Sequence, residues 1–137
     1  MDKKKILTVD DDFNITRLLK FKLNKEGFDV FEAHNGEEAL KTATSLKPDL
    51  ILLDIMMPKM TGWEVNKKLR EDSKLKNIPV IMVTAVSQLN EQLKSLKAEG
   101  VRDYITKPFN FSELINTVNR VLSQTKDNSL SSLNLDS

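Results

Sequence analysis

The stretch ILLDIMMPKMTGWE, residues 51–64, decides the fold. An apolar run over residues 50–53 ends directly in a carboxylate, Asp54, and a loop containing Pro58 and Gly62 follows it. A strand that is apolar at every position is typical of a parallel sheet, because helices cover both faces of such a sheet. The stretch therefore predicts a central buried strand, and it raises the question of why an acid stands at its end.

On both sides of this stretch, short apolar runs alternate with segments of helical period. The runs predict strands over residues 6–9, 30–33, 50–53, 79–84 and 101–105. Apolar residues at helical spacing predict helices over residues 15–23, 35–46, 63–70, 89–96 and 112–122. Gly27 ends the first helix, and Ser112 caps the last. Strict alternation of this kind predicts an α/β fold, with a doubly wound five-stranded parallel sheet and helices on both faces.

Length and composition narrow the function. The 137 residues fit one domain, and the absence of cysteine excludes disulfides, zinc thiolate sites and thiol nucleophiles. A net charge of +1 with dispersed lysines argues against direct contact with nucleic acid. No apolar stretch approaches the ~20 residues that span a bilayer, and no signal peptide is visible, so we expect a cytoplasmic protein without a membrane partner.

The C-terminal end differs from the rest of the chain. Residues 1–123 form the predicted domain, whereas residues 124–137 are polar and offer no packing partner for Leu130, Leu133 and Leu135. We expect this segment to be a disordered tail or the stub of a linker.

Polar side chains follow four of the predicted strands. They are Asp10 and Asp11 after the first, Asp54 after the third, Thr84 at the end of the fourth and Lys107 just beyond the fifth. Each has an ordinary explanation by itself, such as a helix cap, a β-branched strand residue or a surface lysine. In a doubly wound sheet, however, ligands bind outside the carboxyl ends of the strands. The pattern therefore favours a ligand-binding site, because it brings three acids, a hydroxyl and an ammonium to one edge of the sheet.

The chemistry of these groups suggests phosphoryl transfer. Three carboxylates in one crevice repel each other unless a cation neutralises them, and an all-oxygen set without histidine or cysteine suits Mg²⁺. Mg²⁺, Lys107 and the Thr84 hydroxyl would together neutralise a phosphoryl group. Asp54, the acid that stands alone on its strand end, is the candidate nucleophile that would form an aspartyl phosphate.

Four motifs carry a resemblance to a known family. VDDD at 9–12, DIMMPKMTGWE at 54–64, VTA at 83–85 and DYITKPF at 103–109 resemble the receiver domain of two-component response regulators, and single-domain chemotaxis regulators in particular. The resemblance covers residues 4–123. It implies a flavodoxin-like sheet with strand order 2-1-3-4-5.

The resemblance also implies a role for each residue of the site. Asp54 would be the phosphoacceptor, and Lys107 would hold the phosphoryl oxygens. The metal would be bound by Asp11, Asp54, the backbone carbonyl of Met56, and Asp10 through water. Thr84 and Tyr104 would be the switch pair, the small Ala85 would allow access, and Met56 and Val86 would flank the attacking water. The Lys107–Pro108 bond is predicted to be cis, an isomer that costs only ~0.5–1 kcal/mol before proline.

The expected function is a phosphorylation-controlled switch in a two-component or phosphorelay pathway. The donor would be a phosphohistidine on a sensor histidine kinase or a histidine phosphotransfer protein. The response would change the face formed by the fourth helix, fifth strand and fifth helix and so control an output protein, as a monomer or a phosphorylation-dependent dimer. Enzymatic activity would be limited to self-phosphorylation and self-dephosphorylation. Two alternatives stay open: a receiver fragment of a larger DNA-binding or enzymatic regulator, and a Mg²⁺-dependent phosphohydrolase.

Overall fold

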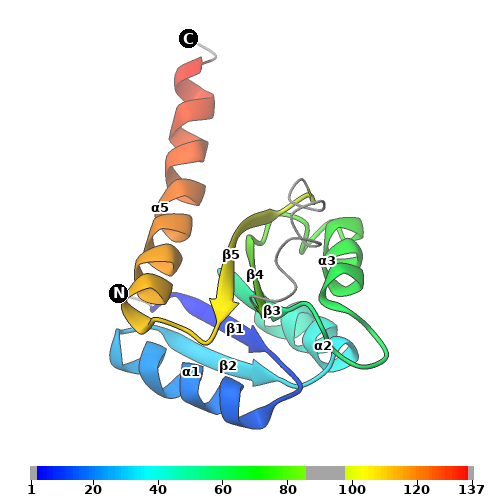
Figure 1. Cartoon of the computed structure of the whole chain (residues 1–137). Coiled ribbons are helices and arrows are strands. Elements are labelled where there is room, and N and C mark those ends of the chain that lie inside the picture. The colour runs from blue at the N-terminus through cyan, green and yellow to red at the C-terminus, as the bar shows by residue number, and fades with distance from the viewer. Residues whose placement is uncertain (1–2, 86–97, 136–137) are drawn as a thin grey trace.

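The computed structural model describes residues 3–85 and 98–135, with side chains as far as residue 124 (Figure 1). Along the chain the elements are β1 (Lys5–Val9), α1 (Phe13–Lys25), β2 (Asp29–Ala33), α2 (Gly36–Leu46), β3 (Leu50–Asp54), α3 (Gly62–Glu71), β4 (Val80–Ala85), β5 (Val101–Lys107) and α5 (Phe111–Leu135). The helix predicted from Leu89, Leu93 and Leu96 lies outside the described residues.

The five strands form one parallel sheet in the order β2-β1-β3-β4-β5, which confirms the predicted topology. Val9 at the end of β1 pairs in register with Leu53, and Asp54 pairs with Val83. Because all strands run the same way, their carboxyl ends meet at one edge. The residues that follow β1, β3, β4 and β5 are thereby brought close together.

The apolar residues of β3 divide between two cores. Leu50 and Leu52 belong to one core, with residues of α1 and α5, while Ile51 and Leu53 belong to the other, with residues of α2 and α3. All four side chains are at most 1% exposed. The wholly apolar run thus serves both faces of the sheet, as expected for a strand covered on both sides.

Polar caps fix where the helices start. Asp12 caps α1 by accepting the Asn14 N–H, and Asn35 caps α2 by accepting the Glu38 N–H. At α5 the predicted cap, Ser112, is wrong: the helix already includes residue 111, and the Asn110 side chain accepts the Glu113 N–H at 3.1 Å. Asn110 wins because its carboxamide lies three residues before that free N–H, the spacing of an N-cap.

The last helix is longer than expected. The sequence predicted a helix over residues 112–122, whereas α5 continues to Leu135 and runs beyond the end of the sheet (Figure 1). Residues 124–135 contain neither glycine nor proline, so no residue interrupts the backbone hydrogen bonds of the helix. Among the described residues, no helix combines the length and apolar character needed to cross a membrane.

Candidate functional site

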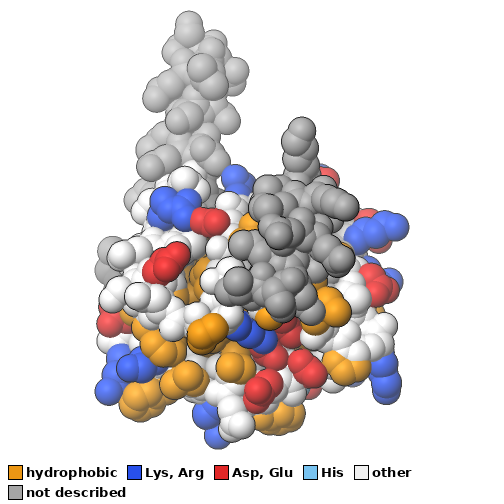
Figure 2. All heavy atoms as spheres, in the orientation of Figure 1, with side chains coloured by type: hydrophobic (Ala, Val, Ile, Leu, Met, Phe, Trp, Pro, Cys, Tyr) orange, Lys and Arg blue, Asp and Glu red, His pale blue; other side chains and the backbone are white. Residues whose placement is uncertain are grey.

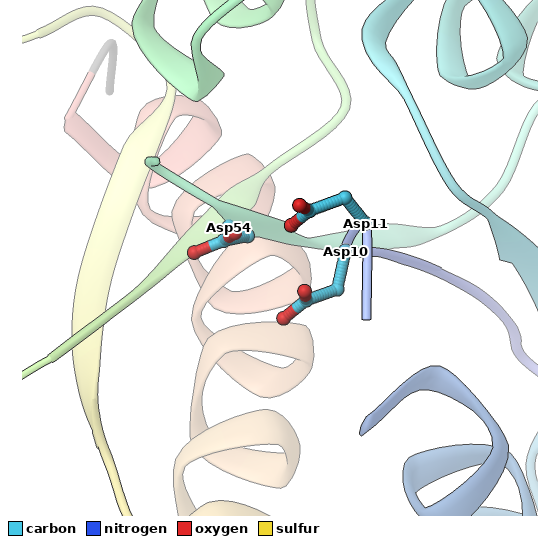
Figure 3. A group of neighbouring side chains, drawn as sticks. All are labelled: Asp10, Asp11 and Asp54. Carbon is cyan, nitrogen blue, oxygen red and sulfur yellow. The ribbon is translucent and has the colours of Figure 1, made fainter. Parts of the chain in front are cut away.

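Three acids converge at the carboxyl edge of the sheet. Asp10 and Asp11 follow β1, Asp54 ends β3, and Figure 3 shows the three side chains close to one another at this edge. One oxygen from each lies within 4.8 Å of the others. Asp10 and Asp54 are only 2% and 4% exposed, whereas Asp11 is exposed. The structure therefore brings together the three acids that the sequence singled out.

Lys107 is the cation of the cluster. Its Nζ lies 2.7 Å from Asp10 Oδ2 and 3.5 Å from Asp54 Oδ1, so the shorter contact is to Asp10. The Lys107–Pro108 bond is cis, as predicted. Three carboxylates and one ammonium leave a formal charge of −2 at this edge.

The protonation of the cluster reflects this imbalance. Burial, followed by the negative charge of Asp10, raises the pKa of Asp54 to about 6, although the Lys107 ammonium and the Met56 N–H act in the opposite direction. Burial would lower the pKa of Lys107, but its hydrogen bond to Asp10 and the charges of both acids outweigh this and raise it. At neutral pH, Lys107 is charged and most Asp54 carboxyls are ionised.

The donor set fits a divalent cation. An acidic triad of this kind is typical of Mg²⁺ sites, since that ion takes oxygen ligands and is held by few carboxylates. A dication also matches the residual charge of −2. Asp11, being exposed, leaves one side of the triad open to solvent, where an ion would keep several waters.

The loop between β3 and α3 is pressed against Asp54. The Gly62 N–H donates to the Ile55 carbonyl at 2.8 Å, and a Cβ at Gly62 would stand 2.3 Å from the Asp54 carbonyl oxygen. Only glycine fits so close to another backbone. The same loop holds Met56, which is 52% exposed and whose backbone N–H donates to the Asp54 carboxylate. The sequence showed Gly62 as a loop signal but gave no sign of this close approach.

The remaining predicted residues lie on β4 and β5. Thr84 is 1% exposed near the end of β4, and Ala85 pairs in register with Lys107. Tyr104 is partly buried and packs against Trp63 of α3, with ring centroids 6.3 Å apart and planes tilted by 53°. Val86 lies outside the described residues.

Sequence reasoning missed a second polar cluster, which lies at the amino ends of β4 and β5. Arg70 of α3 donates to the carbonyls of Lys76 and Ile78 and to the Asn66 side chain. The Asn66 amide donates in turn to the Glu99 carbonyl at 2.9 Å. Because most acceptors are backbone carbonyls, no pattern of side chains in the sequence predicts the cluster.

Comparisons with known proteins agree on one family. Residues 6–119 match the family model described as response regulator receiver domain. The alkaline phosphatase synthesis transcriptional regulatory protein PhoP of Bacillus subtilis is 43% identical over 123 residues, which are 90% of this chain and 50% of that protein. The chain spans about half the length of the curated relatives it matches.

Solved structures show the same fold. The chemotaxis protein CheY4 of Vibrio cholerae is 36% identical, with a TM-score of 0.81 over 88% of this chain and 99% of that one. The response regulator TrrA of Thermotoga maritima, solved in complex with Mg²⁺ and BeF, is 43% identical, with a TM-score of 0.74 over 85% of this chain and 97% of that one.

Proposed function

The chain belongs to the family of response regulator receiver domains, and we propose that it is a switch turned on by phosphorylation of Asp54. The observation that carries the proposal is the placement of Asp54. Its carboxylate is buried beside two more acids and one lysine, its pKa is about 6, and the cluster retains a charge of −2. A nucleophile that is ionised at neutral pH and an opening for a dication are the two requirements for forming an aspartyl phosphate.

The side chains have distinct parts in the proposed transfer. An Asp54 oxygen attacks phosphorus, the new O–P bond forms, and the P–N bond to the histidine of the donor breaks, leaving a neutral imidazole once that ring takes up a proton. The Lys107 ammonium, 3.5 Å from Asp54 before transfer, neutralises the incoming phosphoryl oxygens. Asp10, Asp11, Asp54 and the Met56 carbonyl would hold Mg²⁺, which supplies the rest of the positive charge that the phosphoryl group needs.

The switch itself is proposed to involve Thr84 and Tyr104. The Thr84 hydroxyl would turn toward the phosphoryl group as a hydrogen-bond donor, and Tyr104, two residues back along the adjacent strand, would move into the space this leaves. Beryllofluoride on Asp54, standing in for the phosphoryl group, is then expected to shift NMR signals over residues 89–104. Shifts confined to the loops around the acids would contradict this part of the proposal.

The donor is proposed to be a protein that bears a phosphohistidine. Three of the large hydrophobic side chains that remain exposed lie on α1, which starts directly after the acids: Phe13, Leu18 and Phe21. In Figure 2, hydrophobic side chains lie along the bottom of the molecule, where Figure 1 places α1, and acidic side chains lie above them. An apolar surface beside the nucleophile suits a helical protein that presents a histidine, so Phe21→Ser is expected to slow transfer from such a donor but not from acetyl phosphate.

The central test uses acetyl phosphate with Mg²⁺. We expect the intact mass to rise by one phosphoryl group (~80 Da) in the wild type and in the matched variant Asp12→Asn, which keeps the helix cap. No gain is expected in Asp54→Asn or in EDTA. An equal gain in Asp54→Asn would refute the assignment. Release of many equivalents of phosphate from simple phosphoesters would instead support a Mg²⁺-dependent phosphohydrolase.

A second candidate function is based on the length of the relatives. The chain covers 50% of PhoP and 50% of the DNA-binding regulator RpaA of Synechocystis, so the same switch would also serve as one part of a longer transcriptional regulator. Reading the gene to its stop codon separates a stand-alone switch from such a regulator.

A further inference from the structure

We propose that Met56 is an oxidation site, and that its sulfoxide shortens the life of the phosphoryl group on Asp54. The inference rests on the function proposed above. The chain has five methionines and no cysteine, so control through thiols is impossible and thioethers are its only reversibly oxidised sulfur groups.

Among the four methionines within the described residues, exposure selects Met56. Its exposed fraction is 52%, against 6% for Met57 and 0% for Met82. Met60 is partly buried and packs against the core beneath α2 and α3, with its sulfur close to Gly36. A peroxide in solution therefore reaches the Met56 sulfur directly, while Met57 and Met82 are covered.

The position of Met56 joins this exposure to the acids. Its backbone N–H donates to the Asp54 carboxylate, and the close packing of Gly62 against the Asp54 carbonyl holds the loop in place. Asp54 itself is only 4% exposed. An exposed thioether thus stands two residues from a buried nucleophile, on a loop whose backbone is fixed to it.

Oxidation changes what this side chain offers to water. Hydrogen peroxide transfers one oxygen to the sulfur: an S–O bond forms, the O–O bond breaks, water leaves, and the sulfur loses two electrons. A thioether is a weak acceptor, whereas a sulfoxide carries a polar oxygen that accepts hydrogen bonds. Hydrolysis of an aspartyl phosphate needs a water in line with the bond that breaks. A sulfoxide oxygen at this place would accept a hydrogen bond from that water and position it.

The experiment measures oxidation and lifetime on the same full chain. Limited treatment with hydrogen peroxide is followed by peptide mapping, and we expect sulfoxide at Met56 well before Met57 or Met82. Treated and untreated protein are then phosphorylated with acetyl phosphate and Mg²⁺, the donor is removed, and the loss of the ~80 Da group is followed. We expect loss to be about 3- to 10-fold faster after oxidation, and methionine sulfoxide reductases to restore the slow rate.

Met56→Leu is the matched variant, because it keeps the apolar volume and removes the sulfur. Its phosphoryl lifetime is expected to stay constant after peroxide. Oxidation of Met57 or Met82 as fast as Met56, an unchanged lifetime in oxidised wild type, or the same acceleration in Met56→Leu would each overturn the inference. If untreated protein takes up no phosphoryl group, the proposed function is wrong and the inference falls with it. Uptake with an unchanged lifetime after oxidation removes the inference alone.

Discussion

Among the described residues, the acid cluster at the carboxyl edge and the Arg70 cluster on α3 have their charges balanced differently. At the carboxyl edge of the sheet, Asp10 and Asp54 share one cation, Lys107, and stand beside a third acid. On α3, the Arg70 guanidinium donates four hydrogen bonds to neutral acceptors, which are the carbonyls of Lys76 and Ile78 and the side-chain oxygen of Asn66.

The Arg70 cluster joins three parts of the chain. The Arg70 Nη2 lies 2.7 Å from the Ile78 carbonyl in front of β4, and Asn66 reaches the Glu99 carbonyl in front of β5. The guanidinium also lies flat over Gly100, where φ is +82° and a Cβ would stand 2.1 Å from Arg70 Cζ. Burial lowers the pKa of Arg70, yet two of its N–H groups donate to backbone carbonyls and two to the Asn66 side chain.

The difference separates a structural charge from a functional one. A partly buried ion such as Arg70, which donates mainly to backbone carbonyls, fixes the surrounding backbone. A buried group whose charge is not balanced, such as Asp54 with its pKa of about 6, is held in an unfavourable state that a ligand relieves. If this contrast is correct, removing Arg70 damages the fold, whereas removing Asp54 damages only function.

The largest expected effect is on stability. Arg70→Met leaves two backbone carbonyls and the Asn66 oxygen without a donor, and we expect the free energy of unfolding to fall by about 2–4 kcal/mol. Urea unfolding followed by circular dichroism measures it. The matched control is Arg102→Met, because Arg102 is exposed and should change stability by less than ~0.5 kcal/mol. Similar losses of stability in the two variants would contradict the claim that the Arg70 cluster has a structural role.

The next effect is the pH dependence of the acid cluster without metal. The pKa of Asp54 is about 6 in the folded chain against an ordinary 3.8, so between these values the folded state binds more protons than the unfolded state. Stability due to Asp54 is therefore greatest below about pH 4 and is lost as pH rises through about 6. The loss is at most about 3 kcal/mol, and screening of the charge interactions by solvent reduces it further.

The measurement is urea unfolding of the wild type and of Asp54→Asn in EDTA, from pH 4 to 7.5. Subtracting one curve from the other cancels the other titrating groups to first order. As pH rises, the free energy of unfolding of the wild type should fall relative to that of Asp54→Asn. A difference that stays flat would show that Asp54 is not held in an unfavourable ionised state.

Much of this molecule follows from its sequence, because parallel strands bring their carboxyl ends to one edge. That rule alone places Asp10, Asp11, Asp54 and Lys107 together. The same sequence does not show that Lys107 lies nearer Asp10 than Asp54, since this depends on side-chain conformation.

Other features escape the sequence for physical reasons. The partners of Arg70 are mainly carbonyls, which every residue has, so the cluster leaves no motif. The close approach of Gly62 to Asp54 depends on the path of a loop. The last helix was predicted to end at residue 122, whereas α5 continues to Leu135 through residues that include no helix breaker.

A third test adds the cation. At a Mg²⁺ concentration 100-fold above the dissociation constant, we expect the free energy of unfolding to rise by about 2.7 kcal/mol at neutral pH, because the ion binds only the folded site. The gain should shrink below pH 6, where protons compete for Asp54. Asp11→Asn should lose most of it, while Arg70→Met, though less stable, should keep it. A variant of Arg70 that loses the Mg²⁺ response would show that the two clusters are not independent.

The smallest expected effect concerns the lifetime of the phosphorylated form. It tests the proposed functional role of the acid cluster. The family resemblance implies that Met56 and Val86 would flank the approach of water, and because both are apolar, we expect neither to orient that water through a hydrogen bond. Replacing them by polar residues in the double variant Met56→Asn, Val86→Glu should speed the loss of the phosphoryl group several-fold, since each ~1.4 kcal/mol of barrier is a factor of ten and positioning supplies part of the barrier.

This comparison needs protein that is otherwise unchanged. Met56 is 52% exposed, so its replacement should leave the free energy of unfolding within ~0.5 kcal/mol, and the Mg²⁺ response should match that of the wild type. With both conditions met, a faster loss is due to the two replaced side chains and not to a weaker fold or metal site. Equal or slower loss would mean that these side chains only pack against neighbouring loops, and that the buried charges alone set the lifetime.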